Sequence, residues 1–352
     1  MASPEKQIEF LSNLQRLLAE GSFVSTYKYA LLLSLADLCV ELGRDDDVPM
    51  EIPTRRIGEK FAEYYWRQCA PYLPAGGEDA GLLKQNTGEP PMIIKLLQSH
   101  RQAYEDSLAK LRHDEKTWNR TVTQIAAQVR KMPLWKLQTV GSQQLDFLYD
   151  RSGGSDTSIT LKPGMGFCFR KHYPLVVDLV KGAWAQYVRR YNASRLAEKT
   201  DLYEFLFGSE HANLAVVRPI LRHFQEGACF YCQQPVMKEA GHVDHFIPWS
   251  RYPVDLGHNF VLAHAACNEQ KSDRLPAAQH LDAWVKHNQR VGRDKAIEFQ
   301  RRGVFQDLAT SARVMDWAYR QTNEFHGLTW LRAKTLEPLP ADWNHSLVSI
   351  LN

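Results

Sequence analysis

The chain has 352 residues, 44% of them hydrophobic and 24% charged, which is the composition of an ordinary globular protein. This length suits two or three domains. The formal net charge of +3 is too small to identify a partner, so the local distribution of charge carries more information. The N-terminus, MASPEKQIEF, lacks the apolar core of a secretory signal, and residues 29–40 are too short and too often interrupted by polar residues to span a bilayer. We therefore expect a cytoplasmic protein with no membrane partner.

Apolar periodicity predicts a mainly helical chain. Residues 8–18 place leucines and an isoleucine on one helical face before Gly21, and residues 23–42 continue as a buried helix that ends at Gly43. Thr54 is a plausible N-cap for an amphipathic helix. Further helices are expected over residues 92–111, 117–129, 174–196, 214–224, 277–291 and 294–321.

A change in composition occurs at Gly153–Gly154. After it, residues 159–170 (ITLKPGMGFCFR) hold short β-prone runs around a Pro-Gly turn, and this pattern predicts a β-hairpin. The segment from Gly327 onward is uninformative, and the sequence contains no internal repeat or low-complexity segment.

Three of the six cysteines belong to one cluster. Cys229 and Cys232 form a CxxC pair, and His264 and Cys267 form a second pair at the same spacing. Two short-spaced ligand pairs around a longer insert suit tetrahedral zinc, and a metal is favoured over disulfides in a chain without an export signal. We therefore predict a structural Zn²⁺ site at these four residues. The alternative is two chance pairs of half-buried cysteines.

The residues between the two pairs resemble the HNH endonuclease family. Residues 243–248 read V-D-H-F-I-P, similar to the first strand of these nucleases. Residues 259–262 (N-F-V-L) resemble the second element, and residues 267–271 (C-N-E-Q-K) resemble the start of the helix. The resemblance covers residues 229–274, and no family is recognised for the remainder. It implies a ββα-metal fold that hydrolyses phosphodiester bonds in DNA and leaves 5′-phosphate and 3′-hydroxyl ends.

Phosphodiester hydrolysis needs an activated water and positive charge at the non-bridging oxygens, where negative charge accumulates. The resemblance implies that His245 is the general base and that Asp244 and Asn268 ligate one Mg²⁺ or Mn²⁺ ion. It also implies that Asn259 braces the loop that orients His245. Neighbouring residues of a strand point to opposite faces, so Asp244 and His245 can share a substrate only where the backbone leaves regular strand geometry.

Candidate DNA contacts lie in two regions. Lys271 and Arg274 follow on the expected helix of the module, where they would reach phosphates or simply form a solvated face. Between residues 162 and 195 basic residues outnumber acidic ones, and Asp178 alone opposes them. Aromatic residues at helical spacing in this stretch are more typical of a core. The candidate contacts of this second region are Arg170, Lys171, Lys181, Arg189 and Arg190.

These observations predict a mainly α protein with a small α+β module. The expected division is a helical region of unknown role (1–150), a hairpin and basic helix (151–224), the HNH module (225–280) and a helical C-terminal region (281–352). The expected function is metal-dependent DNA cleavage, by nicking in a monomer or by double-strand cleavage through two copies or two sequential events. A role in restriction or antiviral defence and a partner protein of such a system are expected by family analogy. The alternatives are a non-catalytic zinc-stabilised DNA-binding or adaptor protein and an RNA-directed nuclease. The sequence does not indicate the oligomeric state.

Overall fold

The computed structural model is mainly helical, with 57% of the described residues in helices, and this confirms the expected fold class. The structure describes residues 1–72, 81–150, 157–196, 202–208, 214–237 and 240–351. Gly153–Gly154 lie outside these residues. The chain divides into two compact units, Met1–Gly208 (unit 1) and Ser209–Asn352 (unit 2). In the described ranges, the strands form antiparallel pairs, and none of the helices is long and apolar enough to cross a membrane.

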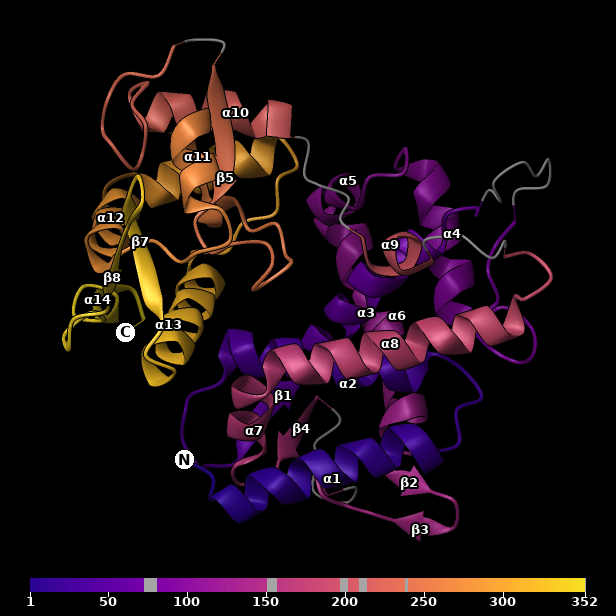
Figure 1. The fold of residues 1–352 in the computed structure, drawn as a ribbon. Helices are drawn as coiled ribbons and strands as arrows, with labels where there is room; N and C mark the ends of the chain where they lie inside the picture. Colours follow the sequence, from indigo (N-terminus) through magenta and orange to yellow (C-terminus); the bar gives the residue numbers. More distant parts are fainter. Residues whose placement is uncertain (73–80, 151–156, 197–201, 209–213, 238–239, 352) are drawn as a thin grey trace. The chain divides into compact units, whose positions relative to one another are not determined.

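Unit 1 is a helical assembly whose described strands form small antiparallel pairs (Figure 1). Its helices are α1 (Pro4–Glu20), α2 (Tyr27–Leu42), α3 (Thr54–Gln68), α4 (Met92–Ala103), α5 (Leu108–His113), α6 (Glu115–Val129), the irregular turn η1 (Arg130–Leu134), α7 (Met165–Lys171), α8 (Tyr173–Tyr191) and α9 (Leu202–Phe207). Its strands are β1 (Met50–Pro53), β2 (Thr139–Val140), β3 (Gln143–Gln144) and β4 (Ser158–Leu161).

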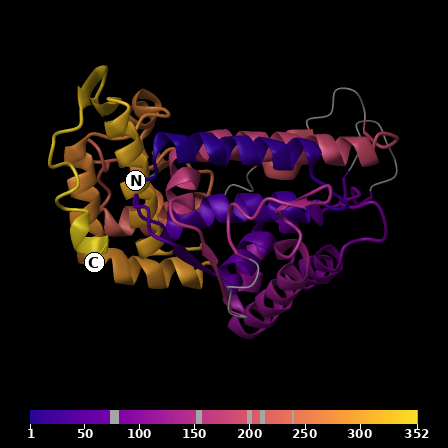
Figure 2. The ribbon, with the colours of Figure 1, turned by 90° about the horizontal axis from the view of Figure 1, so that it is seen from below.

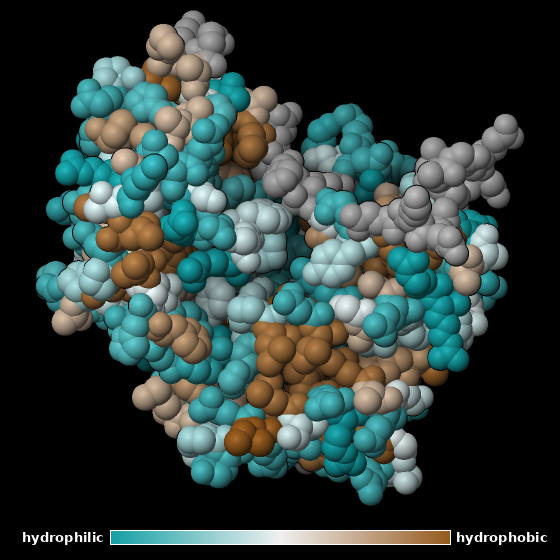
Figure 3. All heavy atoms as spheres, viewed as in Figure 1, coloured by the Kyte–Doolittle hydropathy of each residue, from teal (hydrophilic) through white to brown (hydrophobic). Residues whose placement is uncertain are grey.

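The core of unit 1 forms around α2, in which every residue from Tyr27 to Glu41 is buried. Helices α3, α7 and α8 pack against it, and α1 and α8 run in nearly the same direction (Figures 1 and 2). Trp184 and Tyr187 of α8 are buried, which confirms that these aromatic residues belong to the core. On the outer face of α8, Leu175 and Leu179 are exposed, and hydrophobic surface gathers over this part of the helix (Figure 3).

A buried polar network explains how α2 tolerates a carboxylate within its apolar sequence. Asp37 is 5% exposed and accepts hydrogen bonds from the hydroxyls of Tyr64 at 2.5 Å and Tyr173 at 2.8 Å. Lys60 forms a buried ion pair with Glu41 at 2.6 Å. Because each charged group has a partner, the network avoids the cost of an isolated buried charge.

Two local expectations for unit 1 are corrected by the structure. The helix expected over residues 92–111 is broken into α4 and α5, because Glu105 and Asp106 adopt positive φ angles and Ser107 caps the second helix. The hairpin expected over residues 159–170 is absent from this described stretch: β4 pairs with β1, from Met50↔Leu161 to Pro53↔Ser158, and the following residues form α7. Gly164 has a φ of +78°, and it ends the extended segment and starts the helix.

Unit 2 contains a central ββα segment with helices and a C-terminal hairpin around it. Its helices are α10 (Leu214–Phe224), the 3₁₀ turn η2 (Gly257–Asn259), α11 (Ala265–Lys271), α12 (Ala278–Arg301), α13 (Leu308–Glu324) and α14 (Val348–Leu351). Its strands are β5 (Gly241–His245), β6 (Phe260–His264), β7 (Leu328–Arg332) and β8 (Thr335–Pro338). The helices expected over residues 277–291 and 294–321 are divided elsewhere: α12 continues to Arg301, and the break lies at residues 302–307, where Gly303 has a positive φ and Asp307 caps α13.

The C-terminal region of unit 2 packs directly on the ββα segment. Trp330 of β7 is 2% exposed, and its ring contacts Tyr231 edge to face, with 5.2 Å between centroids. The backbone N–H of Ala277 donates to the Trp330 carbonyl at 2.7 Å. Trp284 of α12 is fully buried and donates to the carbonyl of His258 at 2.8 Å. The segment after residue 280 therefore completes the core of the ββα segment.

Candidate functional site

Strands β5 and β6 form the framework of the candidate site. They pair without irregularity from Gly241↔His264 to His245↔Phe260, and α11 begins directly after β6 and packs against both strands. Gln225, at the end of α10, accepts from the Leu262 N–H at 2.7 Å and donates to its carbonyl at 3.0 Å. These bonds fix α10 to β6 and hold the first cysteine pair near the end of the hairpin.

The four predicted zinc ligands lie together in the structure. One ligand atom from each of Cys229, Cys232, His264 and Cys267 lies within 4.8 Å of the others. In the first pair, the Gln233 N–H donates to the Cys229 carbonyl at 2.9 Å, and Gln233 takes a positive φ of 60° that closes the turn. In the second pair, His264 is the last residue of β6 and the N-cap of α11, and Cys267 lies in the first turn of α11.

The orientation of His264 suits metal binding. Its Nε2 lies 3.1 Å from the carbonyl oxygen of Pro235, and its Nδ1 lies 3.3 Å from the sulfur of Cys232. A carbonyl can only accept, so Nε2 carries the proton and leaves the lone pair of Nδ1 directed at the cluster. Burial and the neighbouring Cys229 and Cys232 raise the pKa of Cys267 to about 12. A cation favours the thiolate forms that this crowding disfavours, so three sulfurs and one imidazole nitrogen fit Zn²⁺.

His245 is held by a carboxylate that the sequence analysis did not identify. Its Nε2 lies 2.7 Å from Oδ1 of Asp255, and the two side chains are 12% and 15% exposed. The imidazole also contacts the rings of Phe260 and Trp249, with 4.9 Å and 5.3 Å between centroids. Within the described part of the chain, no hydrogen-bond partner occupies Nδ1. The imidazole is therefore oriented through one nitrogen while the other is available to a substrate or water.

Asn259, the last residue of η2 before the start of β6, bonds to the segment after His245. Its Oδ1 accepts from the Ile247 N–H at 2.7 Å, and its Nδ2 donates to the Ile247 carbonyl at 3.0 Å. The Phe246 N–H also donates to the Asn259 carbonyl at 2.8 Å. A buried amide in these bonds fixes the backbone where it leaves β5, next to the candidate base.

Asp244 has different partners from His245. Its carboxylate is 7% exposed and accepts from the Tyr231 hydroxyl at 2.5 Å and from the Lys271 ammonium at 3.1 Å. Lys271 also donates to the His245 carbonyl at 2.9 Å. Burial raises the pKa of Asp244 against the opposing effects of Lys271 and Tyr231, and burial lowers the pKa of Lys271.

The expected oxygen ligands of a catalytic ion are therefore only partly available. Asn268 is half-buried, and its side chain makes no hydrogen bond to any described residue. Asp244, in contrast, already accepts hydrogen bonds from an ammonium and a phenol. A divalent ion at Asp244 would therefore compete with Lys271 for the carboxylate.

The structure also separates the expected DNA contacts. Arg274, Arg189 and Arg190 are exposed, and Lys171 and Lys181 are half-buried, the latter beside the ring of Phe207. Lys271 is 0% exposed and bound inside unit 2. Its expected phosphate contact is corrected to an internal ion pair, because a carboxylate and a carbonyl already hold the ammonium.

Arg170 requires the same correction. It is 1% exposed, with Nε 2.6 Å from Oδ1 of Asp45 and Nη1 3.0 Å from the Val40 carbonyl. Its guanidinium therefore fixes the loop that contains Asp45 to the end of α2 and presents no surface to DNA.

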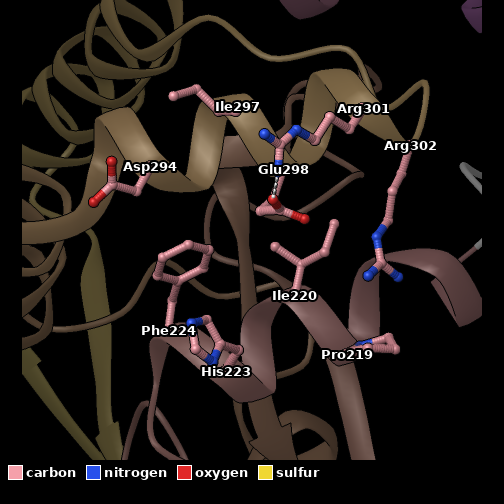
Figure 4. Close-up of a pocket in the computed structure, with 9 residues that line it drawn as sticks. All are labelled: Pro219, Ile220, His223, Phe224, Asp294, Ile297, Glu298, Arg301 and Arg302. Atoms are coloured by element: carbon pink, nitrogen blue, oxygen red, sulfur yellow. Dashed lines mark hydrogen bonds and ion pairs between the residues drawn. The ribbon is translucent and has the colours of Figure 1, made fainter.

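A cavity of about 490 Å³ lies between α10 and α12, away from the residues of the motif (Figure 4). Ile220, Phe224 and Ile297 form its apolar part, while Glu298 and Arg301 bond each other at its side. None of the zinc donors, His245 or Asp255 lines it. The cavity is thus separate from the candidate site.

Comparison with known families assigns both parts of the chain. The family model described as "HNH endonuclease" matches residues 229–277, which hold the four metal donors and the residues around His245. This segment is an HNH endonuclease domain, as the sequence resemblance predicted. The model described as "Domain of unknown function (DUF8808)" matches residues 7–206, more than half of the chain, and the protein belongs to this family. No curated protein and no solved structure matches the chain.

Two residues of this site were missed by sequence reasoning. Asp255 lies in an irregular loop, and Tyr231 lies inside the CxxC pair. Neither position follows a helical or strand period, so no local pattern marks them. A search for carboxylates between the first strand and Asn259 would have found Asp255.

Proposed function

We propose that this protein is an endonuclease that hydrolyses phosphodiester bonds in DNA, with His245 as the general base. The observation that carries the proposal is the geometry of this histidine. Asp255 engages Nε2 at 2.7 Å, and Nδ1 has no hydrogen-bond partner among the described residues. This arrangement lies inside the segment that matches HNH endonucleases, at the end of a zinc-compatible ββα framework.

The chemistry follows from that arrangement. A water molecule at Nδ1 would transfer a proton to His245 as it attacks phosphorus, and the 3′ oxygen would leave. The negative charge of Asp255 stabilises the imidazolium that forms and fixes its orientation. Asn259 keeps the backbone after His245 in place through its two bonds to Ile247.

A divalent ion, Mg²⁺ or Mn²⁺, would supply positive charge for the non-bridging phosphate oxygens. Asn268 has a side chain that is available for such an ion, whereas Asp244 would first have to exchange Lys271 for it. We therefore propose metal dependence as an HNH property to be tested. The zinc-compatible cluster is closed by four protein donors and has a structural role in this proposal.

The direct test is cleavage of supercoiled plasmid by the full chain with Mg²⁺, with Mn²⁺ and without added metal. We expect nicked circles from the wild type and a loss of about 10²-fold or more in rate for His245→Ala. His242→Ala is the matched control, because His242 lies on the same strand and is exposed. Equal nicking by wild type and His245→Ala would reject the proposal.

A parallel assay on structured RNA separates the proposed substrate from its alternative. Cleavage of RNA that depends on His245, without cleavage of DNA, would favour an RNA-directed nuclease. DNA binding without any cleavage across both metals would favour a non-catalytic DNA-binding or adaptor protein. We also propose, by family analogy alone, that the protein acts in restriction or antiviral defence.

A further inference from the structure

The longest acid-free stretch of unit 1 that carries several cations runs from Lys116 to Leu145. Glu115 precedes it and Asp146 follows it, and no acidic residue lies between them. The stretch contains Lys116, Arg120, Arg130, Lys131 and Lys136, which gives five positive charges. All five residues are exposed. Such a local excess is informative in a chain whose total charge is close to balanced.

These cations have few counter-charges. In the described ranges of the chain, Lys116, Arg120, Lys131 and Lys136 form no ion pair. In contrast, the basic residues of α3, such as Arg55 and Arg56, are paired with Glu59. Neighbouring ammonium groups without carboxylates repel one another, and an anionic partner relieves this repulsion.

The segment Arg130–Lys136, here called the basic segment, also exposes apolar surface. Trp135 is 55% exposed and Met132 is 37% exposed, between the cations of the same segment. An exposed indole among cations suits a strand of nucleic acid, because the cations neutralise phosphates and the ring stacks on a base.

The backbone of the basic segment is fixed by buried residues and hydrogen bonds. Pro133 and Leu134 are buried, and the hydroxyl of Tyr149 donates to the Leu134 carbonyl at 2.8 Å. The Lys136 N–H donates to the Pro133 carbonyl at 2.9 Å. These contacts hold the backbone while Lys131, Trp135 and Lys136 reach solvent. A partner would therefore meet a surface that is already ordered, which lowers the entropic cost of binding.

We propose that the basic segment binds a DNA strand that has at least one unpaired base. The cations contact the phosphates, and Trp135 stacks on the base. Unit 1 thereby gains a nucleic-acid ligand outside the HNH segment, and the role of the basic segment as a substrate contact rests on the proposed nuclease function.

The test measures binding of a labelled single strand and of the corresponding duplex by fluorescence anisotropy. It uses the full chain with His245→Ala, so that binding is read without cleavage and independently of the nuclease proposal. The charge variant is Lys131→Glu with Lys136→Glu. The matched control is Arg44→Glu with Lys95→Glu, because both residues are exposed in unit 1, form no ion pair with a described residue and give the same change in net charge.

We expect the Lys131/Lys136 variant to bind the single strand about tenfold more weakly than the control variant at low salt. The slope of log affinity against log salt concentration should become less steep by about 1.4, because each of the two lost phosphate contacts removes roughly 0.7 from it. Equal binding by the two variants would overturn the proposal, since total charge alone would then explain any loss.

A second set of variants tests the stacking contact of Trp135. Trp135→Ala should weaken single-strand binding about fivefold or more, whereas Trp135→Phe should retain most of the affinity and duplex binding should change little. Unchanged single-strand binding by Trp135→Ala, in protein with wild-type thermal stability, would overturn the stacking contact. An equal loss on the duplex would also overturn it.

Discussion

Asp255 and His245 form a carboxylate–imidazole pair with 2.7 Å between Oδ1 and Nε2, and both side chains are largely shielded from solvent. The pair joins the end of β5 to the loop before η2. It fixes the tautomer of the imidazole, because a carboxylate oxygen can only accept a hydrogen bond from Nε2–H. The lone pair of Nδ1 is then the one that can accept a proton.

Asp255→Asn should therefore slow cleavage without a comparable effect on DNA binding. The amide keeps the size of the side chain but removes the negative charge that stabilises the imidazolium, and its NH₂ group can favour the wrong tautomer. We expect the rate at saturating DNA to fall by about 10²-fold. Asp294→Asn, at an exposed acid of α12, is the control and should cleave at the wild-type rate.

A loss that appears only as a higher KM would contradict this role for Asp255. Circular dichroism and thermal denaturation would show whether the variant is folded, so that a structural defect is recognised. Restoration of most of the rate by Asp255→Glu would support a requirement for the carboxylate.

Zinc content gives the second prediction. The purified chain should contain one zinc ion per molecule by mass spectrometry of the metals, and Cys229→Ser or Cys267→Ser should abolish it. Zinc sites of this type contribute about 10–16 kcal/mol of apparent binding free energy, which is comparable to the whole stability of a domain. Unit 2 should therefore unfold in these variants, while unit 1 keeps its own thermal transition.

Cys168→Ala is the control for this experiment, because Cys168 is a buried cysteine of unit 1 outside the cluster. It should retain the full zinc content. Wild-type zinc content in Cys229→Ser would exclude this residue as a ligand.

The zinc donors and the HNH segment could be predicted because each depends on residues that lie close together in sequence. The CxxC spacing and the order of the motif are visible in the sequence without knowledge of the tertiary fold. The partners of His245 and Asp244 could not be predicted in the same way. Asp255 lies in a loop without periodicity, and Lys271 resembles an exposed helix residue until α11 packs on β5.

In unit 1, too, features set by residues close in sequence were predictable, whereas contacts between distant residues were not. The aromatic residues of α8 follow a helical period. The burial of Trp184 and Tyr187 was predicted correctly, whereas Tyr191 is only half-buried. The pairing of β4 with β1 joins residues more than 100 positions apart, as in Ile52↔Ile159, and no local pattern specifies it. Arg170 appears basic and available in the sequence, but Asp45 and the end of α2 enclose it.

The third prediction concerns the buried pair of Lys271 and Asp244. Lys271→Met removes the ammonium and leaves a 7% exposed carboxylate without its cation, which should cost about 3–5 kcal/mol in the free energy of unfolding. The double variant with Asp244→Asn should recover much of this loss, because the uncompensated charge is gone. Urea denaturation followed by circular dichroism measures both.

Arg274→Met is the comparison for Lys271→Met, since Arg274 is exposed three residues further along the chain. We expect it to change the free energy of unfolding by less than about 0.5 kcal/mol. If both variants were equally stable and only Lys271→Met bound DNA weakly, the ammonium would act on phosphate and the internal ion pair would be rejected.

The fourth prediction is the pH dependence of unit 2 through His258. Burial is the main reason that the pKa of this 1% exposed histidine is lowered from 6.5 to about 4, and its Nε2 lies 3.1 Å from the Gly292 carbonyl. The folded state thus holds a neutral imidazole, while the unfolded state takes up a proton below about pH 6.5. The stabilisation is complete above that pH and is lost as the pH falls from about 6.5 towards 4.

A shift of this size corresponds to a loss of about 3 kcal/mol from His258 alone. His258→Gln removes the titrating group and keeps an amide that can donate to the Gly292 carbonyl. Urea denaturation at pH 7 and pH 4.5 should show a smaller loss of stability in this variant than in the wild type. Both proteins share the zinc-compatible cluster, so acid release of metal affects them alike and the difference reports His258. An equal loss in the two proteins would mean that His258 is not held neutral in the folded state.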